Sequence, residues 1–161
     1  AMGMAMPAHA ANSSAASKAK ILAPVTVAAT GELDFGTFVT DGSGGIIDLD
    51  QNGNRTSCMG FSICSGATSA ATFQATGTVG QTLVITSPGN FFLTGSNGGT
   101  VEIGNVIFSG PDVTVVSYFN STAVVPASGS LNFNMTGSLW AQPGTDNGEY
   151  SGSFTVNVNY Q

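Results

Sequence analysis

Residues 148–161 read GEYSGSFTVNVNYQ, and this stretch decides the fold class. Its apolar residues Phe154, Val156, Val158 and Tyr160 alternate with threonine and asparagine. Because successive side chains of a strand point to opposite faces, this period of two predicts a strand with one buried face. The chain ends at Gln161, so we expect no later strand to cover this one.

Short runs of the same kind recur upstream, separated by turns rich in glycine and asparagine, and no segment carries a helical pattern. The expected strands cover residues 21–28, 33–39, 46–49, 71–76, 82–86, 91–93, 101–108, 113–119, 131–140 and 154–160. Many short strands at this spacing are typical of an all-β sandwich or a partly open barrel.

The composition bounds the size of the fold and the class of partner. The chain has 161 residues, which suits one domain, and 42% of them are apolar, enough for one sizeable core. Three basic residues, Lys18, Lys20 and Arg55, stand against nine acidic ones. Nucleic acids and anionic membranes need a surface of several Lys or Arg, so both are poor candidates as partners, and we expect no nucleic acid. No apolar run approaches the roughly 20 residues of a membrane-spanning helix.

Cys58 and Cys64 are the only cysteines. Zinc would need further thiolates or histidines, and the only histidine is His9, near the N-terminus. We therefore expect a disulfide that either closes a small loop or staples neighbouring strands. Two buried free thiols are the alternative.

Residues 48–54 (DLDQNGN) match the first half of a calcium-binding loop. The twelfth position, where a bidentate glutamate is needed, is Met59. We expect a strand that ends in an Asn-Gly turn, and no metal or cofactor.

The sequence also lacks an evident catalytic arrangement. Its single histidine lies far from the body of the chain, and the acidic pairs Glu32/Asp34 and Asp48/Asp50 lie near turns, where solvated carboxylates are common. We predict that the protein is not an enzyme. Trp140 and Tyr150 suit a core or rim position, with stacking on a carbohydrate or another partner as the alternative.

The N-terminal residues allow several interpretations. Met2, Met4, Met6, Ala8 and Ala10 would share one face of an extended strand, which suggests an arm that docks elsewhere. We divide the chain into this arm with its linker, residues 1–19, and a β domain, residues 20–161. The alternatives are the tail of a signal peptide ending in an A-x-A site, an expression remnant, or a disordered tail.

Three segments carry a family resemblance: residues 33–36 (LDFG), 133–139 (FNMTGSL) and 148–161. They resemble segments of bacterial pilus subunits of the chaperone–usher type. The resemblance is closest to a bacterial surface-domain family, domain of unknown function 4402, and more distant to archaic pilins related to spore coat protein U. It extends over residues 20–161. Many such pilins join their first two strands by a disulfide, whereas Cys58 and Cys64 lie later in the chain.

The resemblance implies an immunoglobulin-like β-sandwich that lacks its final strand. A neighbouring subunit would donate that strand, and a periplasmic chaperone would fill the gap until an outer-membrane usher adds the subunit to a fimbria outside the cell. In this chain the donor strand would be Met2, Met4, Met6, Ala8 and Ala10, and the acceptor groove Phe154, Val156, Val158 and Tyr160. The alternative function is a monomeric or tip-located adhesin that binds glycan or matrix at the cell surface or in a biofilm.

Overall fold

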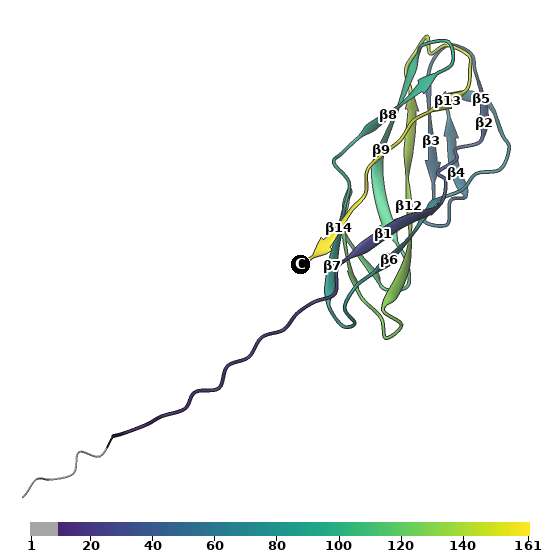
Figure 1. Ribbon diagram of the computed structural model, residues 1–161. Helices are drawn as coiled ribbons and strands as arrows, with labels where there is room; N and C mark the ends of the chain where they lie inside the picture. The colour runs from purple at the N-terminus through teal and green to yellow at the C-terminus, as the bar shows by residue number, and fades with distance from the viewer. Residues whose placement is uncertain (1–9) are drawn as a thin grey trace, which may run out of the picture.

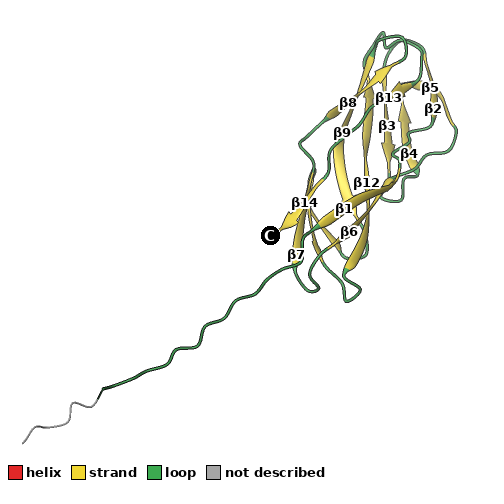
Figure 2. Cartoon of the chain, in the orientation of Figure 1, coloured by secondary structure: helices red, strands yellow, loops and turns green. Residues whose placement is uncertain are grey.

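The structure is a computed structural model that describes residues 10–161, and all the regular structure in that part of the chain is β-strand (Figure 2). Every strand pairing is antiparallel. The predicted all-β class is therefore confirmed.

The larger sheet has eight strands and curls into a half-barrel. Its path runs β1–β6–β12–β9–β8–β13, while β3 pairs with the second half of β12 and carries β4 on its other side. These strands are β1 (Thr26–Gly31), β3 (Gly45–Leu49), β4 (Arg55–Met59), β6 (Ala71–Thr76), β8 (Phe91–Gly95), β9 (Thr100–Ser109), β12 (Ser130–Ala141) and β13 (Tyr150–Ser151).

Two smaller sheets complete the domain (Figure 1). A four-stranded sheet has the order β10–β11–β7–β14, and β2 pairs with β5 alone. Their bounds are β2 (Thr37–Thr40), β5 (Phe61–Ser65), β7 (Thr82–Thr86), β10 (Val113–Ser117), β11 (Asn120–Val124) and β14 (Asn157–Tyr160).

The core forms two clusters that β12 joins. The first lies between the larger and the four-stranded sheet and includes Phe73, Phe108 and Phe133. The second includes Phe35, Phe61 and Leu139 and lies beside the β2–β5 pair. A register shift between Thr136 and Ser138 divides β12 into these two halves. A Cβ atom at Gly137 would lie 2.6 Å from the Gly104 carbonyl oxygen, so the close approach at this bulge requires glycine.

The predicted disulfide is present, between Cys58 on β4 and Cys64 on β5, with the two Cα atoms 6.3 Å apart. Both sulfur-bearing side chains pack against the second core cluster. Since β4 belongs to the larger sheet and β5 to the two-stranded one, the disulfide staples neighbouring strands of different sheets.

Several predicted elements differ from the structure. Of the strand predicted over residues 33–39, the structure has β2 at Thr37–Thr40 and an isolated bridge from Asp34 to Ser69. The first strand begins at Thr26, not at residue 21, and the side chain of Ile21 is 95% exposed. Pro24 lacks an N–H group, and the pairing with β6 starts only after it. No strand was expected between residues 50 and 70, whereas the structure has β4 and β5 there, joined by the disulfide.

The expected single strand over residues 113–119 ends at Ser117, and the chain reverses into β11. The reversal places Phe119 at a φ of +64°. A bulky aromatic residue rarely adopts that conformation, so the sequence carries no turn signal at this point.

The LDFG segment packs tightly against β4 and β5. Leu33 contacts both core clusters, Phe35 is buried, and the Asp34 carboxylate accepts a 2.8 Å hydrogen bond from the Gly36 N–H. Gly36 has a φ of +78°, and a Cβ atom there would collide with the Arg55 guanidinium and lie 2.7 Å from the Ser65 carbonyl oxygen. The guanidinium itself donates to the carbonyl oxygens of Phe35 and Ser65 at 3.2 and 2.9 Å.

Substitution of Gly36 tests this contact. We expect Gly36→Ala to lower the free energy of unfolding by more than about 3 kcal/mol, because it adds a collision to the conformational cost of a positive φ. Gly42→Ala is the matched control, since Gly42 has a φ of +93° and no neighbouring atom within 4 Å of the added Cβ. Its cost should stay near 1–2 kcal/mol, roughly the conformational term alone. Equal midpoints for the two variants in urea unfolding would contradict the collision.

Candidate groove between β1 and the C-terminal segment

Two chain segments run side by side without pairing to each other. Within residues 10–161, β1 pairs only with β6, and β14 pairs only with β7, so each strand has one unpaired edge. At one end Tyr160 contacts Ala23, just before β1, and at the other end residues 150–154 lie opposite residues 31–34. The two segments therefore run in opposite directions along one side of the domain.

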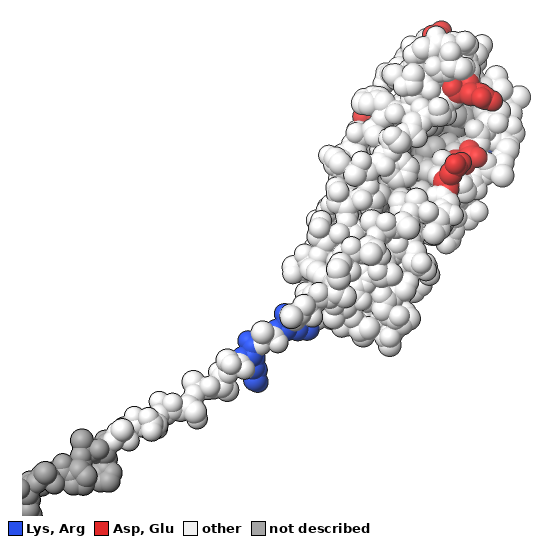
Figure 3. All heavy atoms as spheres, in the orientation of Figure 1, with Lys and Arg blue, Asp and Glu red and all other residues white. Residues whose placement is uncertain are grey.

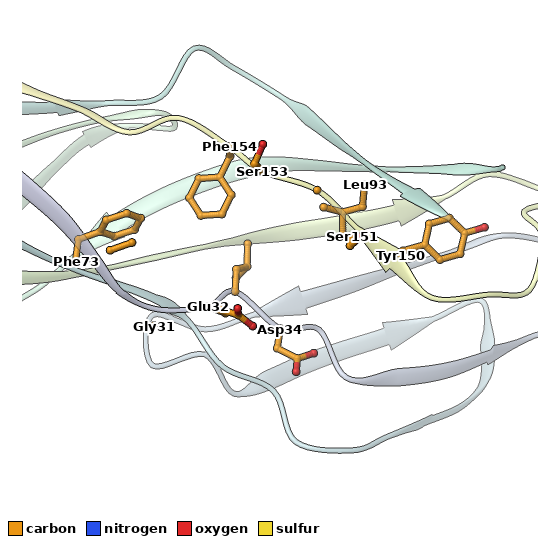
Figure 4. A pocket seen from close by; sticks show the side chains of 12 residues that line it. Gly31, Glu32, Asp34, Phe73, Leu93, Tyr150, Ser151, Ser153 and Phe154 are labelled. Atoms are coloured by element: carbon orange, nitrogen blue, oxygen red, sulfur yellow. The ribbon is translucent and has the colours of Figure 1, made fainter. Parts of the chain in front are cut away.

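The space between them is a groove of about 520 Å³ (Figure 4). Phe154 and Leu93 project from one wall, and Glu32 and Asp34 lie on the other. Phe73 lies at one end of the groove. The groove is thus lined by both apolar and polar residues, with the aromatic rings of Phe73 and Phe154 and the carboxylates of Glu32 and Asp34 among them.

Phe154 connects this groove to the core through a chain of aromatic contacts. Its ring centroid lies 5.0 Å from that of Phe91 and 6.2 Å from that of Phe73. Phe73 in turn stacks on Phe133 at 5.2 Å, and Phe133 meets Phe108 at 6.1 Å. Offset and edge-on aromatic contacts at these distances are favourable, so the groove interior is an exposed extension of the first core cluster.

The structure places Phe154, Val156, Val158 and Tyr160 on one face of the chain, half-buried against the first core cluster. Regular pairing begins only at Asn157, because residues 152–156 cross from the larger sheet to the four-stranded sheet and belong to no strand. Of the four predicted acceptor residues, only Phe154 lines the groove; Val156, Val158 and Tyr160 do not. The lining residues that sequence reasoning did not assign to the groove are Ala29, Gly31, Glu32, Leu33, Asp34, Phe73, Leu93 and residues 150–153. Leu33 lies in the LDFG segment, but nothing in the sequence indicated which strands flank the gap.

Of the predicted donor residues, Met2, Met4, Met6 and Ala8 lie outside the described residues. Ala10 is described and is exposed, outside any strand. Residues 10–20 are all exposed and lead away from the end of the domain where β1 begins and β14 ends (Figure 1).

A family comparison matches residues 25–160 to the model of a domain of unknown function, DUF4402. The chain belongs to this family. No curated protein and no solved structure matches it. The matched residues of this DUF4402 domain include both walls of the groove, from β1 to Tyr160. Within the described part of the chain, no helix is long and apolar enough to cross a membrane.

Charge is divided between the arm and the DUF4402 domain (Figure 3). All nine acidic residues follow residue 31, and Arg55 is the one basic residue among them. The other two basic residues, Lys18 and Lys20, lie on the exposed segment that leads away from the domain. Opposite net charges therefore lie on the two parts of one chain.

In the loop from Asp48 to Asn54, both carboxylates accept hydrogen bonds from groups of the protein. The two Asp50 carboxylate oxygens accept hydrogen bonds from the N–H groups of Asn52 and Asn54, both at 2.9 Å, and from the Asn54 side chain at 3.2 Å. Asp48 accepts a hydrogen bond from the Ser138 hydroxyl. Among residues 10–161, no three histidine, cysteine or acidic side chains gather as a metal site would need.

The hydrogen bonds at Asp50 make the loop sensitive to acid. The N–H and side chain of Asn54 lower the pKa of the Asp50 carboxyl, because they stabilise its charged form. A carboxyl whose pKa is lowered by folding stabilises the fold above its unfolded value and loses that contribution as the pH falls through the lowered value. We expect Asp50→Ala to be less stable than wild type at pH 7, and the difference to shrink below about pH 4. Urea unfolding at pH 7, 4 and 2.5 measures it, and a difference that grows with acid would contradict the assignment.

Trp140 and Tyr150 take different positions. Trp140 is half-buried on β12, next to Leu139 of the second core cluster and on the opposite face of the sheet. Tyr150 packs against that cluster, lines the groove and donates a 2.6 Å hydrogen bond to the Asp146 carbonyl oxygen. Burial, with a smaller effect of the Asp146 charge, raises the pKa of Tyr150.

Proposed function

We propose that this protein is a structural subunit of an extracellular fibre, and that a strand from the N-terminal arm of a neighbouring copy fills its groove. The observation that carries the proposal is a groove beside Phe73 and Phe154, between β1 and the C-terminal segment, whose strands β1 and β14 each have one unpaired edge. With a strand inserted, the sheets would approach the immunoglobulin-like sandwich that the sequence resemblance implies.

The physical argument concerns backbone N–H and C=O groups that have no hydrogen-bond partner at the strand edges. An unpaired strand edge presents free N–H and C=O groups, and an exposed edge beside apolar side chains is a template for another chain. A strand lying between β1 and the C-terminal segment would pair its backbone on both sides and bury alternate side chains over Phe73 and Phe154. This is β-augmentation, in which main-chain bonds give affinity and pockets for alternate side chains give selectivity.

The properties of the arm support the proposal that the groove is filled by the arm of a second copy of the chain. Its described part is exposed and leads away from the domain, so it is available to another molecule. The pattern of Met2, Met4, Met6, Ala8 and Ala10 supplies apolar side chains at every second position, as a strand inserted over an apolar floor needs.

The division of charge supports the same pairing. Lys18 and Lys20 follow the proposed donor strand, and Glu32 and Asp34 line the groove. An arm of one copy is therefore attracted to the acidic domain of the next, and complementary charge of this kind speeds encounter between partners.

Assembly would follow the route of the families that the sequence resembles. An unfilled apolar groove favours aggregation, so a periplasmic chaperone would occupy it until an outer-membrane usher joins subunits at the cell surface. The Cys58–Cys64 disulfide is consistent with an oxidising compartment. We also propose that the role is structural and not enzymatic.

Removal of the arm tests the proposed function. We expect the full chain to form ladders of oligomers that resist mild denaturant, and a chain lacking residues 1–11 to stay monomeric. A synthetic peptide of residues 1–11 should bind the shortened chain, and a peptide with Met4 and Met6 changed to aspartate should not. Size-exclusion chromatography and peptide titration measure both. Ladders from the shortened chain would refute donation by this segment, and a full chain that stays monomeric would favour the alternative of a surface-binding module.

Charge reversal on the arm tests the electrostatic part separately. We expect Lys18→Glu with Lys20→Glu to slow oligomer formation several-fold at low salt, because the arm would repel the acidic domain. The difference should vanish near 1 M salt, where charges are screened over about 3 Å. Lys18→Arg with Lys20→Arg keeps the charge and should assemble at the wild-type rate. A salt-independent defect, followed by light scattering, would mean that these residues act by another means.

A further inference from the structure

Three residues, Ala23, Thr78 and Tyr160, join the segment before β1 to the end of β14 with a ring of hydrogen bonds, outside the lining of the groove. The Thr78 N–H donates to the Tyr160 hydroxyl oxygen at 2.8 Å, and the Tyr160 hydroxyl donates to the Ala23 carbonyl oxygen at 2.6 Å. The Ala23 N–H donates to the Thr78 hydroxyl oxygen at 2.7 Å. The ring ties β14, the turn after β6 and the segment before β1 to one another.

Ala23 is also the point where the arm leaves the domain. Leu22 is half-buried, and the chain upstream of it is free of the domain: Ile21 is 95% exposed, and residues 10–20 are all exposed. Both backbone polar groups of Ala23 are engaged in the ring, and the following residue is Pro24, which restricts Ala23 to extended conformations. The chain is therefore held straight at its exit.

The position of Tyr160 is adapted to this contact. A Cβ atom added at Gly77 would lie 3.3 Å from the Tyr160 hydroxyl oxygen and 3.3 Å from a Val125 methyl carbon, so glycine leaves room for the tyrosine ring. The hydroxyl reaches past Gly77 to both Thr78 and Ala23.

Because the chain is extended where the arm leaves the domain, the arm reaches the groove of its own molecule less easily than that of a neighbour. Ala23 lies beside Tyr160 before the start of β1, whereas the groove lies farther along the same two segments, between residues 29–34 and 150–154. For a subunit's own arm to fill that groove, the chain would have to reverse near residues 21–25 and return beside β1. A short hairpin turn there needs Ala23 to leave the extended conformation and to give up its bonds in the ring. A longer loop through residues 11–22 closes at a higher cost in chain entropy.

We propose that Tyr160 is a positioning residue that directs the arm away from its own groove and so favours donation to a neighbour over self-insertion. The inference rests on the proposed function, because it assumes that the arm fills a groove of this kind.

Disulfide trapping in the full chain separates the two outcomes. The described chain has no free cysteine, so Met6→Cys with Ser153→Cys introduces one reactive group on the arm and one at the groove lining. Under mild oxidation, a bond within one chain gives a compact monomer on a non-reducing gel, and bonds between chains give a ladder. The ratio of the two reports self-insertion against donation at a fixed protein concentration.

In this background we expect Tyr160→Phe to raise the ratio of intramolecular to intermolecular bonds roughly fivefold, about the equilibrium effect of one neutral hydrogen bond. Thr78→Val removes the hydroxyl that accepts from the Ala23 N–H and lies 3.2 Å from the Tyr160 hydroxyl oxygen, and it should shift the ratio in the same direction. Tyr118→Phe is the matched control, since Tyr118 is 56% exposed in the turn between β10 and β11, and it should leave the ratio unchanged.

The outcomes distinguish the inference from the proposed function. If Tyr160→Phe and Thr78→Val both assemble with the wild-type ratio, the positioning role is wrong while strand donation stands. If the parent double-cysteine chain forms neither kind of bond, the proposed function itself fails. A purely structural role for Tyr160 would lower the yield of folded protein without changing the ratio.

Discussion

A strand edge in a protein interior has to satisfy its backbone N–H and C=O groups, and an apolar side chain beside it has to be removed from water. Within residues 10–161, the strands β2, β4, β5, β10 and β13 each have one partner, and so do β1 and β14. The unpaired edges of β1 and β14 differ in that they lie along one side of the domain, on two segments with a groove between them. The remaining architecture leads to this side, because Phe154, Phe73 and Phe133 carry the first core cluster outward into the groove.

The other end of the domain is built differently. There the Arg55 guanidinium, the Cys58–Cys64 disulfide and the tight turn at Gly36 fasten the β2–β5 pair to the larger sheet. One of these contacts is a covalent bond, one is made by a charged side chain, and one is a turn that has no room for a side chain. All three lie at the same end of the domain. The bulge at Gly137 lets β12 serve both regions, with β6 beside its first half and β3 beside its second. The end of the domain that contains β2 and β5 is thus held by local contacts, whereas the side formed by β1 and β14 keeps unpaired strand edges.

Alternation in the sequence was sufficient to predict the β class and several strands, since β6 and β7 lie at the predicted residues 71–76 and 82–86. The inward face of Phe154, Val156, Val158 and Tyr160 followed from the same period. Pairing partners could not be predicted, because periodicity fixes which face is buried and says nothing about which strands are neighbours. The sequence therefore predicted only part of the groove. Its wall at β1 and its floor at Phe73 depend on long-range strand pairing, which the sequence did not indicate. The β4–β5 pair was missed because its residues alternate weakly around the two cysteines.

The aromatic residues are distributed so that different parts of the molecule can be observed separately. Trp140, the single tryptophan, lies on the face of the larger sheet opposite to the core, while Tyr150 lines the groove and Tyr160 ends β14 beside Ala23. Tryptophan fluorescence consequently follows the integrity of the larger sheet, whereas near-ultraviolet tyrosine dichroism, in a Tyr118→Phe background, follows the surroundings of Tyr150 and Tyr160. The fold provides two independent optical signals, one for unfolding and one for filling.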